Sequence, residues 1–158
     1  MYRVGSGLDV HAFAEGVPLW LGGVLIPHAS GLAGHSDGDA AIHALIDALL
    51  GAANRGDIGE WFPSSNEQWR NAPSTTLLHH VWTNLSADGW RLENADLTIV
   101  AAEPRLAPFR QHMRQAIAAA LSCPLEQISL KATTTDGLGA MGRAEGIMAS
   151  AVALLARD

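Results

Sequence analysis

The residues with the clearest capacity for chemistry are Asp9, His11 and His43. Asp9 and His11 flank Val10 in a strand-like segment, so both should leave one face of the strand while Val10 points into a core. One carboxylate and two imidazoles satisfy three positions of a tetrahedral zinc ion and leave the fourth open for water or substrate. These residues are therefore candidate ligands of a catalytic divalent cation, although each residue type taken alone is also common in ordinary structural roles.

The helix predicted around His43 carries a polar stripe on an otherwise apolar sequence. Asp39, His43 and Asp47 follow one another at intervals of four residues, which places them on one side of the helix. A helix buried in a core has no use for such a stripe unless that side faces something polar. Asp39 or Asp47 is therefore a candidate partner that holds the His43 imidazole in one tautomer.

The elements that must position these residues alternate between strands and helices, which predicts one α+β domain over residues 1–158 with a sheet packed against helices. Strands are expected at residues 2–10, 90–101 and 128–133, and a hairpin at 17–26. Helices are expected at residues 40–54, 75–85 and 107–121. The alanine-rich tail, residues 146–156, fits either a helix or one face of a strand.

Composition narrows the class of protein. Charged residues make up 16% of the chain, well below the usual ~25%, which favours an oligomer that covers part of the surface. A net charge of −6 argues against a general nucleic-acid-binding protein, and no apolar run is long enough for a membrane span. Cys123 is the only cysteine, so no disulfide can form within the chain. With no room for a leader peptide before the first strand, we expect a cytoplasmic protein.

Longer stretches around the candidate ligands form a series of motifs. In chain order these are Arg3-Val-Gly-Ser-Gly-Leu-Asp-Val-His11, His35-Ser-Asp-Gly-Asp39 with His43 four residues on, Gly56-Asp-Ile-Gly59, Lys131-Ala-Thr-Thr-Thr135 and Gly142-Arg-Ala-Glu-Gly146. The series closely resembles the 2-C-methyl-D-erythritol 2,4-cyclodiphosphate synthase family of the non-mevalonate isoprenoid pathway. The resemblance runs from about Tyr2 to the C-terminus, and it is specific because the motifs share both order and separation with the family.

The resemblance implies a homotrimer with active sites between neighbouring subunits. It also implies a phosphorus–oxygen lyase that converts 4-diphosphocytidyl-2-C-methyl-D-erythritol 2-phosphate to 2-C-methyl-D-erythritol 2,4-cyclodiphosphate, with release of CMP. By this resemblance one Zn²⁺ per subunit is held by Asp9, His11 and His43 and polarises the β-phosphate. A second ion, Mg²⁺ or Mn²⁺, bridges the substrate diphosphate and touches Asp136.

Further roles follow from the resemblance position by position. His35 and Ser36 match a turn that contacts the 2-phosphate, and Asp57 and Gly59 match positions that hold the erythritol hydroxyls. Thr134 joins the zinc ligands and Asp136 in the catalytic set. The subunit opposite the zinc supplies the wall of a cytidine pocket, matched by Ala101, Pro104, Arg105, Leu106, Thr133 and Thr134.

Arg143 matches an arginine that lines the central channel of the trimer, where an isoprenoid phosphate can bind. A salt bridge with Glu145 at an interface between subunits is the alternative role for this residue.

Three departures from the family pattern bear on activity. Ser64 stands in Phe62-Pro-Ser-Ser-Asn-Glu67, where the family has an aspartate that helps hold the polyol, and the exit of this loop reads Arg70-Asn-Ala-Pro-Ser74. Asp136 replaces the commoner glutamate, which shortens the reach of the carboxylate. Arg105 replaces the usual lysine beside the nucleotide, and the two cations differ in geometry.

The residues alone leave two other functions possible. A zinc hydrolase would hold water at the open metal position, with Asp39 or Asp57 as its general base. An inactive trimeric sensor of isoprenoid phosphates is the second, and the altered loop is its support. Loss of turnover on mutation of His11 would indicate a catalyst, and loss of ligand binding on mutation of Arg143 would indicate a sensor.

Overall fold

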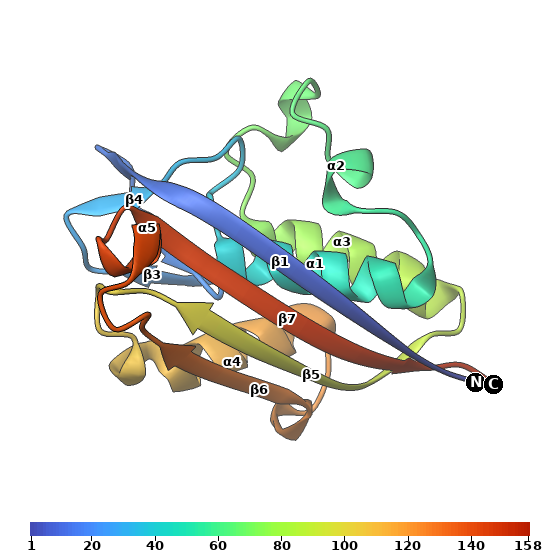
Figure 1. Ribbon diagram of the computed structural model, residues 1–158. Helices are drawn as coiled ribbons and strands as arrows, with labels where there is room; N and C mark the ends of the chain where they lie inside the picture. The colour runs from blue at the N-terminus through green and yellow to red at the C-terminus, as the bar shows by residue number, and fades with distance from the viewer.

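The computed structural model, which describes all 158 residues, is built around two long antiparallel strands (Figure 1). β1 (Tyr2–Glu15) and β7 (Gly146–Ala156) pair from Tyr2 opposite Ala156 to Ala12 opposite Gly146. The alanine-rich tail is therefore a strand at the centre of the sheet. The pairing also brings the two chain ends together, as Figure 1 shows.

The main sheet has the order β4-β1-β7-β5-β6. β4 (Ser30–Leu32) and β5 (Arg91–Val100) run antiparallel to their neighbours β1 and β7, whereas β6 (Ile128–Thr133) runs parallel to β5. β2 (Leu19–Leu21) and β3 (Val24–Ile26) form a separate two-stranded hairpin. The predicted strands and hairpin are confirmed, and β1 extends past its predicted end so that it includes His11.

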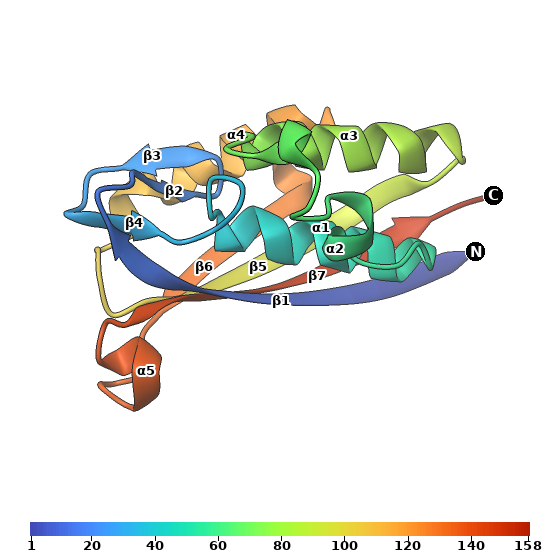
Figure 2. The same ribbon diagram turned by 90° about the horizontal axis from the view of Figure 1, so that it is seen from above.

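Helices cover one face of the sheet (Figure 2). The covering helices are α1 (Ala40–Ala53), α3 (Ser74–Ala87) and α4 (Arg110–Leu121). Single turns complete the chain: α2 (Ile58–Trp61), α5 (Gly139–Gly142), and 3-10 turns at Glu67–Trp69, Ala107–Phe109 and Leu125–Gln127. The fold is the predicted sheet against helices. None of the helices combines the length and the apolar character needed to cross a membrane.

β1 lies unusually close to α1, and this contact brings the two parts of the metal site together. Gly5 and Gly7 face the helix, and a Cβ at either position would collide with the backbone carbonyl oxygen of Ala48 or Ala44. Only glycine therefore permits this approach of strand and helix. Residues 9 and 11 continue the same inward face, so their side chains meet the N-terminal part of α1.

The opposite face of the sheet is uncovered and partly apolar. Val10 is 50% exposed on it, so the expectation that Val10 points into a core is wrong for the isolated chain. The helices occupy the other face, where Asp9 and His11 lie, and the alternation of the strand puts Val10 outside. Its exposed apolar neighbours on β1 and β7 are Tyr2, Val4, Leu8 and Val152.

Candidate metal centre

Asp9, His11 and His43 form the one group of potential metal ligands in the chain. Asp9 Oδ2 lies 2.7 Å from His11 Nε2 and 3.2 Å from His43 Nδ1. The two imidazole nitrogens are 3.2 Å apart. The predicted ligand set from β1 and α1 is thus assembled with one atom of each residue directed to a common point.

Both imidazoles also form hydrogen bonds through the ring nitrogen that faces away from the point where the ligand atoms converge. His11 Nδ1 hydrogen-bonds to the carbonyl oxygen of Ala33, which can only accept, so the proton lies on Nδ1 and Nε2 presents a lone pair. His43 Nε2 lies 2.9 Å from Ser74 Oγ and 3.0 Å from Ser36 Oγ. With its proton on Nε2, His43 presents the lone pair of Nδ1 to Asp9 and His11.

The electrostatics of the cluster favour a cation. Burial opposes ionisation of Asp9, but the close approach of His11 and His43 outweighs this effect and holds the Asp9 pKa well below its usual range. Asp9 in turn raises the pKa of His11, against the opposing effect of burial. Both shifts favour positive charge at the point where the ligand atoms converge, and a bound divalent cation would supply it.

The surroundings of one buried oxygen atom indicate whether a metal ion fits this site. Asp9 Oδ2 is buried and receives no hydrogen bond of acceptable geometry, despite its short distance to His11 Nε2. A buried carboxylate oxygen without a donor is costly. A cation at the point where the three ligand atoms converge satisfies it, and one carboxylate with two imidazoles is a donor set typical of catalytic zinc.

The polar stripe on α1 has a different role from the one predicted. Asp39 is fully buried at the N-cap of α1 and accepts from the amides of Ile42, Gly22 and Gly23 at 3.1, 2.9 and 2.7 Å. Asp47 accepts from the amide of Ile58 at 2.8 Å. Neither carboxylate bonds to His43, so the prediction that one of them sets its tautomer is wrong. Burial raises the pKa of both carboxyls.

The ligands open into a cavity of about 190 Å³. Of the predicted substrate residues, His35, Ser36 and Gly59 line it, beside His11 and His43. Asp57 lies next to this wall, where its carboxylate accepts from the amide of Glu60 at 3.0 Å and caps α2. Sequence reasoning missed the apolar wall, which consists of Ile58, Phe62, Trp69 and Leu77.

The predicted cytidine-binding residues form a second cavity of about 260 Å³ at the ends of β5 and β6. All of the predicted residues line this cavity, although they come from two segments that are far apart in the sequence. No residue lines both this cavity and the metal cavity. The predicted residues in its wall are Ala101, Pro104, Arg105, Leu106, Thr133 and Thr134.

The predicted residues Asp136, Arg143 and Ser64 lie away from both cavities. Asp136 is exposed, at a left-handed φ of 53°, and contacts Thr134 Oγ1 through its amide at 3.2 Å and its carboxylate at 3.5 Å. It does not join the zinc ligands within the chain. Arg143 Nε donates to Glu145 Oε2 at 2.7 Å, so this predicted ion pair exists within the chain. Ser64 is exposed in its loop.

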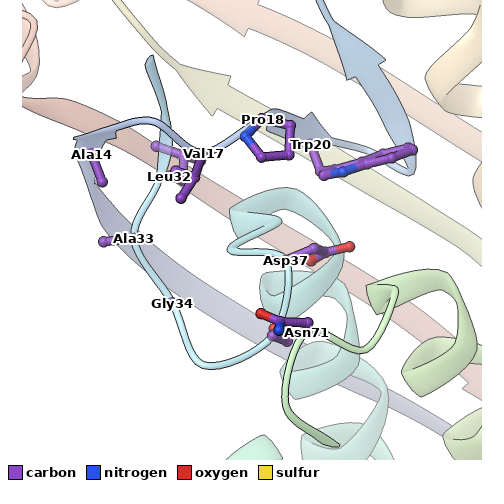
Figure 3. Close-up of a pocket in the computed structure, with 10 residues that line it drawn as sticks. Ala14, Val17, Pro18, Trp20, Leu32, Ala33, Gly34, Asp37 and Asn71 are labelled. Atoms are coloured by element: carbon purple, nitrogen blue, oxygen red, sulfur yellow. The ribbon is translucent and has the colours of Figure 1, made fainter.

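A third and larger cavity, of about 500 Å³, lies on the outer side of the turn that carries Ser36 and contains no metal ligand. Trp20, Asp37 and Asn71 belong to its wall (Figure 3). Figure 3 shows Asp37 and Asn71 beside the turn that carries Gly34, and both residues line this cavity.

The fold and site define a single-domain α+β metalloprotein with an Asp-His-His centre at the contact of a strand and a helix. The chain belongs to the YgbB family, whose sequence profile matches residues 2–156. A curated relative from Alcanivorax borkumensis, "2-C-methyl-D-erythritol 2,4-cyclodiphosphate synthase", is 56% identical over 153 residues, which cover 97% of this chain and 96% of the relative.

Solved structures agree with this family. The bifunctional IspDF of Campylobacter jejuni superposes with a TM-score of 0.95 at 41% identity, covering all of this chain and 43% of that one. This chain thus spans less than half of that two-function protein. A CDP-bound form of 2C-methyl-D-erythritol-2,4-cyclodiphosphate synthase gives a TM-score of 0.89 at 39% identity, covering 98% of this chain and 100% of the other. The predicted family and α+β class are confirmed.

Proposed function

We propose that this chain catalyses the reaction for which its relatives are named. The substrate is 4-diphosphocytidyl-2-C-methyl-D-erythritol 2-phosphate. An oxygen of its 2-phosphate forms a bond to the β-phosphorus while the bond from that phosphorus to the α-phosphate oxygen breaks. The products are 2-C-methyl-D-erythritol 2,4-cyclodiphosphate and CMP. The observation that carries the proposal is the Asp9–His11–His43 cluster with its orphaned buried oxygen.

Catalysis of this step depends on bringing two anionic groups together, so charge neutralisation and positioning supply most of it. A zinc ion on the cluster supplies Lewis acidity toward a β-phosphate oxygen. Asp9, His11 and His43 hold that ion. Ser36, whose hydroxyl faces the metal cavity, and His35 bind the 2-phosphate, while Asp57 and Gly59 position the erythritol hydroxyls, next to the apolar wall of Phe62.

The cytidine end of the substrate is bound in the cavity at the ends of β5 and β6. Support comes from its clustered residues and from the CDP-bound relative of the same fold. Arg105 supplies a cation beside the phosphates, and Thr133 and Thr134 supply hydroxyls. Asp136, which follows directly, would hold the second ion, Mg²⁺ or Mn²⁺, with water extending its reach, and that ion would neutralise phosphate charge.

Each active site is formed by two subunits of a homotrimer. One chain supplies the metal cavity and its neighbour supplies the cytidine cavity, which fits their separation within a single chain. The uncovered apolar face with Val4, Leu8 and Val10 provides a surface for subunit contacts. In the proposed trimer, Arg143 lines the central channel, where its guanidinium can hold an isoprenoid phosphate. The enzyme works in the cytoplasm, without nucleic-acid or membrane partners.

Phosphorus NMR of the purified protein with the cytidyl substrate, Zn²⁺ and Mg²⁺ tests the proposed reaction. A chelated sample and the same sample after zinc is restored serve as controls. Cyclic diphosphate and CMP should appear only with metal present. Linear hydrolysis products would instead indicate a zinc hydrolase, and an unchanged substrate under all conditions would contradict the proposal.

A further inference from the structure

Ser74 is the buried polar residue at the metal site that the family reaction does not use. It is the first residue of α3 and its exposure is 0%. Its Oγ lies 2.9 Å from His43 Nε2 and also hydrogen-bonds to Asp37 Oδ1. A buried hydroxyl with two partners must distribute one donor and its acceptor lone pairs between them.

The partners decide this distribution. A carboxylate only accepts, so the Ser74 hydroxyl donates to Asp37. The oxygen of Ser74 then accepts from His43, which fixes the imidazole proton on Nε2. The lone pair of Nδ1 is thereby directed toward Asp9 Oδ2 and His11 Nε2, at 3.2 Å from each.

Ser36 lies at a similar distance from His43 but is bonded differently. Its Oγ is 3.0 Å from His43 Nε2 and has no other hydrogen-bond partner within the chain. Its proton is therefore not committed, so Ser36 can either donate or accept and does not define a tautomer. Of the two serines, only Ser74 couples Nε2 of the imidazole to a carboxylate.

Asp37 is fixed in turn by the backbone on both sides. It accepts from the Ser74 amide at 2.8 Å and from the Asp39 amide at 3.1 Å. Nearby, the Asn71 amide donates to His35 O at 2.9 Å, so the exit of the 62–74 loop is tied to the 35–39 turn at two points. Figure 3 shows Asn71 beside Asp37 at this junction.

We infer that Ser74 and Asp37 are positioning residues that present His43 Nδ1 to the metal, through the chain His43 Nε2–H to Ser74 Oγ–H to Asp37. Because Ser74 directly follows the loop whose Phe62 and Trp69 line the metal cavity, this relay also links loop position to metal affinity. Hydrogen-bond partners of this kind fix the tautomer and orientation of metal-bound imidazoles. The inference rests on the metal site and is independent of the reaction that the enzyme catalyses.

Zinc competition with a chromophoric chelator tests the relay in Ser74→Ala and Asp37→Asn. We expect zinc affinity to fall about 10- to 100-fold in Ser74→Ala and by a smaller factor in Asp37→Asn. Ser86→Ala, on the exposed end of α3, is the matched control and should bind zinc like the wild type. Asp37→Asn keeps the size of the side chain, so it tests the relay even where Ser74→Ala does not fold.

The tautomer of His43 separates a positioning role from a structural one. In metal-free wild type at neutral pH, long-range ¹H–¹⁵N spectra should show the proton on Nε2, and both variants should show a mixture of tautomers. Wild-type zinc affinity in both variants would overturn the inference. Weakened zinc binding with an unchanged tautomer would also overturn it, because it would assign these residues a role in packing alone.

Discussion

The metal cavity and the cytidine cavity differ in how much of each is finished within one chain. At the metal cavity, hydrogen bonds to Ala33 and Ser74 fix the two imidazoles, and a buried hydrogen bond to Asp39 caps α1. The segment from Thr133 to Asp136 begins in the wall of the cytidine cavity and is mostly exposed, and its side-chain hydrogen bonds reach only neighbours within three residues. Folding fixes the metal cavity, which is the finished half of the proposed site. The cytidine cavity is the open half, which we expect substrate, metal and, in the proposed trimer, a neighbouring subunit to complete.

The largest effect should come from removing a ligand in the finished half. His43→Ala should abolish tight zinc binding and lower kcat/KM by about 10³-fold or more, because several kcal/mol of transition-state charge stabilisation are lost. His112→Ala, an exposed histidine on α4, is the control and should leave both unchanged. Zinc content and turnover are measured on the same samples. Retained zinc in His43→Ala would contradict the assigned ligand set.

The stability of the finished half depends on Asp39. Asp39→Ala leaves the amides of Gly22, Gly23 and Ile42 without a partner and should lower the free energy of unfolding by about 3 kcal/mol. Asp57→Ala, at the exposed cap of the four-residue α2, should cost less than about 1 kcal/mol. Urea unfolding of the zinc-free proteins measures both. Equal losses would mean that the buried cap contributes no more than the exposed one.

In the open half, a carboxylate can be changed without disturbing zinc. Asp136→Asn should lower kcat by roughly 10²-fold through loss of charge at the second ion, while zinc content stays at the wild-type level. Asp136→Glu keeps the charge and should retain most of the activity. Loss of zinc together with turnover in Asp136→Asn would contradict the claim that the open half can be changed independently of the zinc site.

The smallest effect concerns the altered loop. Ser64→Asp restores the carboxylate that the family pattern has at this position and should lower KM for the cytidyl substrate by about threefold to tenfold, with little change in kcat. Ser65→Asp adds the same charge one position along and serves as the control. Steady-state kinetics distinguish them, and an equal change in both variants would point to net charge and not to a polyol contact.

The parts of this site that could be predicted from the sequence are those marked by residue spacing, by helical periodicity or by a family motif. The spacing of Asp9 and His11 and the family motifs indicated the ligand set. The apolar period of α1 indicated the helix that carries His43. The cytidine residues came from the motif positions, and their clustering around one cavity agrees with that assignment.

Other features depend on tertiary context that no local pattern records. The stripe of Asp39 and Asp47 was misread because the N-cap side chain of Asp39 turns back to the start of its own helix. Asp47 accepts from the amide of Ile58, so neither carboxylate bonds to the imidazole. The C-terminal tail that forms β7 is rich in alanine, a composition that fits either a helix or a strand. Its pairing at the centre of the sheet makes it a strand. Ser74 is a single serine after Pro73, and only folding brings it to His43.

Mixing two inactive variants tests most directly that each active site combines a metal half with an open half from a neighbour. His43→Ala chains and Asp136→Asn chains are unfolded, mixed in equal amounts and refolded, and turnover is measured beside each variant alone. If neighbouring subunits share sites in a closed trimer, random mixing should restore roughly a quarter of the wild-type turnover. Mixed oligomers that form but stay inactive would show that both halves must come from the same chain, which would contradict this account.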